Sequence, residues 1–109
     1  MSIAVSWTTF AKITYYEEID FIDKKWTIKE VQDFIFLVEV FIGRLSLGIE
    51  EGKVYPNNHI YSVVISKQTT VFFKKYPKYN TITLLLFWNN QKDPKTLKKL
   101  LYNFRNYYR

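Results

Sequence analysis

The stretch from residue 59 to residue 94 constrains the fold of this chain most. It contains three runs rich in β-branched, aromatic and other apolar residues, HIYSVVIS, TVFFKKYP and TITLLLFWNN, separated by short polar breaks. Such runs between turn residues predict strands, and the short breaks predict antiparallel neighbours. The third run carries Leu84, Leu85 and Leu86 in succession and is apolar on both faces. It is therefore expected to be the central strand.

A helical hairpin is predicted ahead of these strands. In the first segment, apolar residues recur at helical spacing from about Phe10 to Lys24. The predicted inner face consists of Ala11, Tyr15, Ile19, Ile22 and Trp26. The acidic side chains fall largely outside this face and are expected to be solvated: Glu17, Glu18, Asp20 and Asp23.

The second helix of the hairpin has the strongest helical signal in the chain. Thr27 and Glu30 have the spacing of a capping box, in which each side chain satisfies a first-turn backbone N–H. Apolar residues then repeat at helical spacing as far as about Leu47, and Gly48 is expected to end the helix. The repeating positions are Val31, Phe34, Ile35, Val38, Phe41, Ile42 and Leu45. Because few residues separate the two helices, they should lie antiparallel.

The remaining segments complete the predicted order β-α-α-β-β-β-α. Residues 2–7 alternate weakly and predict a short strand in the sheet, whereas residues 48–58 contain the glycine, proline and asparagine typical of a loop. Asp93 and Pro94 predict the start of a last helix, whose buried stripe would be Leu97, Leu100, Leu101 and Phe104. We therefore expect residues 1–109 to form one α+β domain, with the N-terminal helical hairpin packed on a twisted antiparallel sheet. The other face of the sheet would then carry the function.

Several classes of protein are disfavoured by the composition. With no cysteine and one histidine, the chain lacks the residues for a disulfide framework, a cysteine zinc site or a mainly imidazole metal site. We expect no metal and no cofactor. No targeting segment is visible, and the longest uncharged apolar run is about half of the roughly 20 residues that a membrane-spanning helix needs. These features predict a cytoplasmic protein without a membrane partner.

The formal net charge of +6 conceals an asymmetry between the two halves of the chain. Residues 1–52 carry a net charge of −4, whereas residues 53–109 carry +10 because Asp93 is their only acidic side chain. Such a separation predicts a basic surface that meets nucleic acid or an acidic protein. A basic face that serves only solubility remains the alternative.

The candidate binding residues lie in the strand region and its turns. Lysines alternate there with aromatic residues, a mixture that suits single-stranded nucleic acid or an acidic peptide laid along the sheet. Lysines on a sheet edge also discourage aggregation, which is the structural alternative. His59 opens the first strand and, without a positioned partner, is a weak candidate for catalysis. The predicted binding set is Tyr61, Lys67, Lys74, Lys75, Lys78, Trp88, Asn89, Asn90, Gln91 and Lys92, with Tyr76 and Tyr79 interleaved.

From about Val5 to Leu101 the chain resembles the RelE/ParE superfamily of bacterial toxins from type II toxin–antitoxin modules, particularly the ParE-like, plasmid-stabilisation branch. The resemblance rests on short motifs in a shared order: A-x3-Y-x3-I-x2-I-x3-W from Ala11, EVQDF from Glu30, Leu45, ISKQTTVFF from Ile65 and FWNNQKDPKTL from Phe87. It implies a small growth-inhibiting toxin, held inactive in a hetero-oligomer with an acidic antitoxin. RelE-like members cut mRNA on the ribosome, whereas ParE-like members inhibit DNA gyrase.

The sequence departs from the RelE-like pattern at the positions that would carry catalysis. Lys67 matches the basic residue of the turn before the second strand, but Phe73 stands where relatives often have tyrosine and Gln91 where many have arginine. No arginine occurs between Arg44 and Arg105, so a guanidinium that could stabilise a phosphoryl transition state is missing. Lys67, Lys92 and His59 are the remaining catalytic candidates. The resemblance therefore favours a non-nucleolytic, gyrase-directed toxin, with a ribosome-dependent mRNA endoribonuclease or a degenerate fold that only binds its antitoxin as alternatives.

Overall fold

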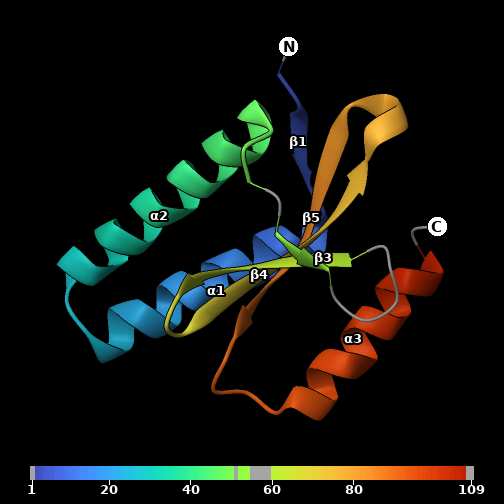
Figure 1. The fold of residues 1–109 in the computed structure, drawn as a ribbon. Helices are drawn as coiled ribbons and strands as arrows, with labels where there is room; N and C mark the ends of the chain where they lie inside the picture. The colour runs from blue at the N-terminus through green and yellow to red at the C-terminus, as the bar shows by residue number, and fades with distance from the viewer. Residues whose placement is uncertain (1, 51, 55–59, 108–109) are drawn as a thin grey trace.

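The computed structural model describes residues 2–50, 52–54 and 60–107, the last three by their backbone alone. His59, a weak catalytic candidate, lies outside the described residues. The elements follow in the order β1 (Ala4–Trp7), α1 (Thr9–Lys25), α2 (Ile28–Leu47), β2 (Lys53–Val54), β3 (Ile60–Ser66), β4 (Thr69–Tyr76), the 3-10 turn η1 (Pro77–Tyr79), β5 (Thr81–Asn89) and α3 (Pro94–Tyr107) (Figure 1). The predicted order is confirmed, with one two-residue strand added in the segment predicted to be a loop. No helix within the described part of the chain is long and apolar enough to cross a membrane.

The five strands form one sheet in the order β1-β5-β4-β3-β2. Strands β2 to β5 pair antiparallel, as predicted, and β5 lies inside the sheet between β1 and β4. The prediction of a wholly antiparallel sheet is wrong for β1, which runs parallel to β5 with Ala4 opposite Thr81 and Trp7 opposite Leu84. Strand direction depends on the crossover through the helical hairpin, and the local alternation of residues 2–7 carries no information about it.

A β-bulge in β5 explains why its leucine run is buried on both faces. Phe72 pairs with Leu86 and Phe73 with Leu84, so Leu85 is the extra residue. As a result, Leu84 packs with the core beneath α1 and α2, whereas Leu85 and Leu86 both pack on the opposite side. A bulge shifts the alternation of faces by one position, so this stretch does not follow a simple two-residue period.

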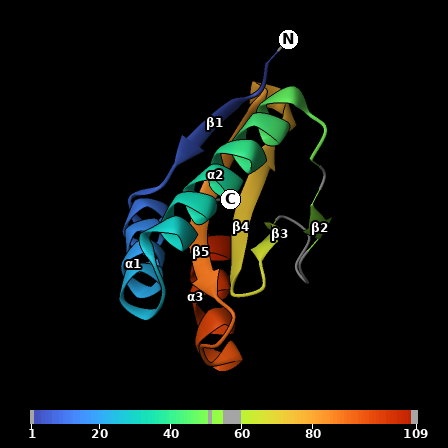
Figure 2. The ribbon, with the colours of Figure 1, turned by 90° about the vertical axis from the view of Figure 1, so that its left-hand side faces the viewer.

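Helices α1 and α2 cover one face of the sheet, as predicted (Figure 2). Helix α2 begins with the predicted capping box, in which the Glu30 carboxylate accepts the Thr27 N–H at 3.2 Å. It ends at Gly48, which adopts a left-handed φ of 75° that glycine tolerates without strain. The predicted stripe is confirmed: Val31, Phe34, Val38, Phe41 and Leu45 are buried, and Ile35 and Ile42 pack beside them.

The predicted inner face of α1 is partly wrong. Its buried residues are Ala11, Thr14, Glu18 and Ile22, which include two polar side chains. Trp26 follows the helix as its C-cap and is 40 % exposed. The two polar residues can be buried because they form hydrogen bonds to the sheet. A search for apolar residues at helical spacing does not detect polar residues that are buried in this way.

Helix α3 covers part of the other face of the sheet (Figure 2). It starts at Pro94 as predicted, with Asp93 Oδ1 accepting the Lys95 N–H at 2.9 Å. Leu97 and Leu101 are buried, and Leu100 and Phe104 pack beside them. The helix rests on a second apolar cluster that also contains Ile60, Phe72, Leu85, Leu86 and Trp88. This face is therefore not wholly open for function, because strand residues on it form a second core.

Candidate functional site

The structure divides the predicted binding residues between two ends of the sheet. The turn end, formed by the β3–β4 turn and the end of β5, holds Lys67, Trp88, Asn89, Asn90, Gln91 and Lys92. The η1 end, around the β4–β5 connection, holds Lys74, Lys75 and Lys78, with Tyr61 beside Lys75. Because these ends are opposite ends of β4, the predicted set does not form one continuous surface.

Asn90 ties the two segments of the turn end together. Its backbone N–H donates to Gln68 O at 2.7 Å, and its side-chain amide donates to Lys67 O at 3.2 Å. Its side-chain oxygen accepts the Thr70 hydroxyl at 2.9 Å. These three bonds hold the β3–β4 turn against the end of β5 and fix the backbone that carries Lys67.

The two lysines of the turn end are its exposed cations. Lys67 and Lys92 both lie at the surface, as does Gln91, which precedes Lys92 in the chain. The Lys92 ammonium lies 5.9 Å from the centre of the Trp88 ring, near the outer limit of a cation–π contact. Trp88 itself is only 6 % exposed and belongs to the core beneath α3, so it offers no free ring on which a base could stack.

A buried carboxylate of α1 forms hydrogen bonds to strand residues at the turn end, and the sequence analysis did not predict this. Glu18 of α1 is 4 % exposed, which corrects the expectation that it is solvated. Its carboxylate accepts the Thr69 hydroxyl and, at 3.1 Å, the side-chain amide of Asn89. The Asn89 oxygen accepts the Gln91 N–H at 2.9 Å, so the chain of bonds runs from α1 to the loop before Lys92.

Burial raises the pKa of the Glu18 carboxyl above its ordinary value. The hydrogen bonds from Thr69 and Asn89 and the positive charge of Lys92 oppose this rise, and Glu17 adds to it. Both oxygens are occupied by fixed donors, and the group is enclosed by α1, β4 and β5. We therefore assign Glu18 a structural role in joining α1 to the sheet.

At the η1 end, Lys74 is buried rather than displayed. It is 3 % exposed, its ammonium donates to the Phe104 carbonyl of α3 at 3.2 Å, and burial lowers its pKa. This lysine thus joins the sheet to α3. A binding role for Lys74 remains a prediction. The side chain could contact a partner only if α3 moved away from it.

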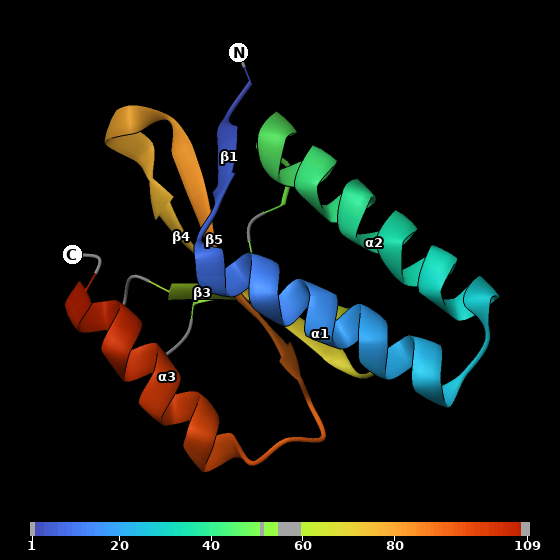
Figure 3. The same ribbon diagram turned by 180° about the vertical axis from the view of Figure 1, so that it is seen from behind.

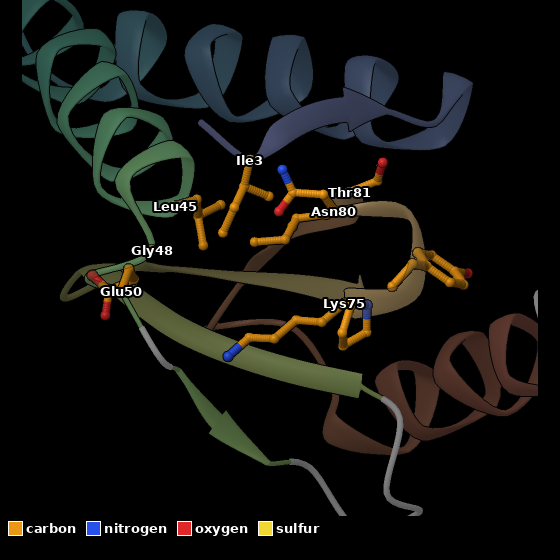
Figure 4. A pocket seen from close by; sticks show the side chains of 10 residues that line it. Ile3, Leu45, Gly48, Glu50, Lys75, Asn80 and Thr81 are labelled. Carbon is orange, nitrogen blue, oxygen red and sulfur yellow. The ribbon is translucent and has the colours of Figure 1, made fainter. Parts of the chain in front are cut away.

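Lys75 lies on the opposite face of β4, with its ammonium 4.2 Å from the centre of the Tyr61 ring. It lines a pocket of about 340 Å³ between the end of α2 and the start of β5. In Figure 4, Ile3 and Leu45 form an apolar side of this pocket, and Lys75 and Glu50 border it. Lys78 lies outside the pocket, exposed in η1 beside Tyr79.

The turn end can attract phosphate or carboxylate groups through two lysine point charges, but its described residues do not include a guanidinium. Among the residues that the structure describes, no group of three histidine, aspartate or glutamate side chains could hold a metal ion. Among the described residues, Glu18 of α1 is the one buried carboxylate beside the turn end, and both of its oxygens accept hydrogen bonds. This arrangement suits electrostatic binding better than acid–base catalysis.

Comparison with known proteins supports the fold. No protein-family profile matches the chain. No curated protein matches it either. Among solved structures, one chain of the toxin–antitoxin complex RelBE2 from Mycobacterium tuberculosis matches with a TM-score of 0.54 and 15% identity, over 83% of this chain and all of that chain. At this identity the likeness establishes the α+β fold, which agrees with the resemblance to the RelE/ParE superfamily.

Proposed function

We propose that this protein is the toxin of a type II toxin–antitoxin module, neutralised by a cognate antitoxin and directed against a target other than mRNA, with DNA gyrase as the expected target. The proposal is supported by the resemblance of the sequence motifs and by the likeness of the fold to a chain of a toxin–antitoxin complex. Fold alone does not specify activity, so the choice of target depends on the residues of the site.

The absence of an arginine fork from the turn end favours a non-nucleolytic toxin. Phosphodiester cleavage needs groups that move protons and a cation that stabilises charge developing on the phosphate. The turn end offers the exposed Lys67, Gln91 and Lys92. The carboxylate of Glu18, beside the turn end, is buried and accepts hydrogen bonds from Thr69 and Asn89. Lysine provides a point charge but not the bidentate geometry of arginine.

The charge distribution supports an acidic antitoxin as the partner. The segment from residue 53 onward has a net charge of +10, and Lys67, Lys78 and Lys92 are exposed on it. A positively charged surface accelerates and orients association with an acidic protein. We propose that the toxin and antitoxin form a hetero-oligomer in the cytoplasm.

The proposal is tested by induced expression in a bacterial host, with and without the protein encoded beside this chain. Total mRNA is mapped for cleavage, and gyrase-dependent DNA breaks are measured in the same cultures. We expect growth arrest, intact mRNA and increased DNA breaks, all reversed by co-expression of the antitoxin.

Each other outcome selects an alternative. mRNA cut at codon boundaries would overturn the choice of target and make the lysines of the turn end catalytic candidates. Normal growth together with a stable complex between the two proteins would indicate a degenerate fold that only binds its antitoxin. Normal growth without complex formation would contradict the proposed function altogether.

A further inference from the structure

A second pocket lies on the helical side of the molecule, away from the predicted binding residues. It has a volume of about 290 Å³ and is lined by residues of β1, α1 and α2. Figure 3 shows how these three elements are arranged. Its lining combines three aromatic residues, two aliphatic residues and two charged residues: Trp7, Tyr15, Tyr16, Val38, Ile42, Lys12 and Glu39. Neither the resemblance nor the proposed function assigns a role to this pocket.

The aromatic residues of this pocket contact one another in different orientations. Trp7 and Tyr15 meet edge to face, with ring centroids 5.2 Å apart and planes at 77°. Tyr15 and Tyr16 are 5.4 Å apart at 63°. Trp7 also stacks on Phe87 at 5.3 Å, which anchors its ring to the core. Tyr15 is thus set at a steep angle to both of its neighbours, so the three aromatic residues that line the pocket do not share one plane. Such a lining can offer an aromatic face to a cation.

Glu39 provides a negative charge at this pocket. It is exposed, and within the described part of the chain it takes part in none of the three salt bridges, which join Lys24 to Asp20, Lys29 to Asp33 and Arg44 to Glu50. Glu39 and Tyr15 both line the pocket. The Glu39 charge contributes, after burial and Tyr16, to the raised pKa of the Tyr15 hydroxyl. Lys12, the other charged residue of the lining, is exposed and flexible enough to extend into water.

We propose that the pocket formed by Trp7, Tyr15, Tyr16 and Glu39 binds the guanidinium group of an arginine side chain carried by a partner protein. A planar guanidinium can stack on aromatic rings and form two hydrogen bonds to one carboxylate, whereas a lysine ammonium can do only part of this. A protein-borne arginine is favoured because Tyr16, which lines the pocket, is 66 % exposed and would pack against the polypeptide that carries the arginine. Ile13, three residues before Tyr16 on the same helix, is 49 % exposed and extends this apolar surface.

The proposal is tested by nuclear magnetic resonance titration of the full chain with Nα-acetyl-arginine methylamide, observed at the Trp7 indole N–H. The matched citrulline compound has the same shape without the charge. We expect saturable shifts with the arginine compound and affinity at least about fivefold weaker with the citrulline compound. Glu39→Gln should weaken arginine binding by about fivefold or more, whereas Lys12→Gln should strengthen it by removing a like charge.

Two further variants separate a binding role from a structural one. Tyr16→Leu keeps an apolar side chain at an exposed position and should weaken binding, whereas Glu17→Gln, on the next residue but outside the pocket lining, should leave it unchanged. Free arginine that binds as tightly as the capped compound would indicate a small-molecule site and overturn the assignment to a protein partner. Equal affinity for arginine and citrulline, unchanged affinity in Glu39→Gln, or no shift at millimolar concentration would overturn the proposal.

Discussion

The two faces of the sheet differ in the depth of the core that covers them. On the hairpin face, α1 and α2 enclose a cluster of twelve buried residues, with further apolar side chains packed around it. On the α3 face the cluster of the described residues has seven buried members, two of which belong to α3 itself. The hairpin face therefore contributes most of the apolar burial, and the α3 face is the thinner layer.

The face with the larger core contributes more to stability, whereas the exposed lysines of the predicted binding set lie nearer the face with the smaller core. The exposed lysines of the turn end, Lys67 and Lys92, lie at the border of the thin layer, while Lys74 and Trp88 are beneath it. A helix that covers a small core can open at a lower free energy than the rest of a molecule. The α3 face is therefore the region where binding and local motion can be coupled.

The largest effect is expected from removing a leucine of the hairpin face. Leu45 in α2 is completely buried in the larger cluster, so Leu45→Ala should lower the free energy of unfolding by about 4 kcal/mol. Leu101 in α3 is 3 % exposed in the smaller cluster, and Leu101→Ala should cost about 2 kcal/mol, because a marginal helix can readjust around the cavity. Urea denaturation measures both values. Equal losses of unfolding free energy in the two variants would contradict the claim that the hairpin face contributes more to stability than the α3 face.

An intermediate effect is expected at the hydrogen bond that joins α1 to the bulged strand. The Thr14 hydroxyl accepts the Phe87 N–H at 2.9 Å and donates to the Phe10 carbonyl. Thr14→Val keeps the shape but leaves that buried N–H without a partner, which should cost about 1–3 kcal/mol. Thr9→Val, at an exposed position of the same helix, serves as the control and should change stability little. A loss in Thr14→Val no greater than in the control would contradict this account.

The smallest effect is expected at Glu18 and depends on pH. Its pKa is raised in the folded protein, so the folded state holds this proton more tightly than the unfolded state does. Stability from this group is therefore present below the ordinary glutamate pKa and is lost as pH rises through the folded value. In Glu18→Gln the side-chain oxygen can accept the Asn89 amide, and the NH2 group can donate to the Thr69 hydroxyl oxygen. Because glutamine does not titrate, the stability of this variant relative to the wild type should increase from acidic to neutral pH. Thermal unfolding measures this difference, which would stay constant across the range if the pKa of Glu18 were the same in the folded and unfolded states.

Much of the fold followed from local signals in the sequence. The stripe of α2 from Val31 to Leu45, its capping box and its end at Gly48 depend only on neighbouring residues, and all three predictions were confirmed. The apolar run Leu84–Leu86 was expected to mark the central strand. Strand β5 does have a neighbour on each side, but the middle strand of the sheet is β4. Non-local features were missed: the parallel pairing of β1, the bulge at Leu85 and the cover provided by α3 all depend on contacts between distant segments.

The candidate site was only partly predictable for the same reason. Composition identified Lys67 and Lys92, which are exposed at the turn end, but it also selected Lys74, Trp88 and Asn89, which are buried. Strand residues alternate between faces, and only the packing of α3 and Glu18 decides which of them reach the surface. Glu18 carried no signal in the sequence, because a buried carboxylate on a helix looks like a solvated one until its donors are located.

The most direct test of the central claim is the growth arrest caused by a Lys67→Ala, Lys92→Ala double variant. A matched control, Lys24→Ala with Lys29→Ala, removes the same charge from exposed ion pairs of the hairpin, which contribute little to stability. Circular dichroism confirms that both variants fold. We predict that the turn-end variant loses growth arrest and the control retains it. Full arrest by a folded turn-end variant would contradict the assignment of function to this end of the sheet.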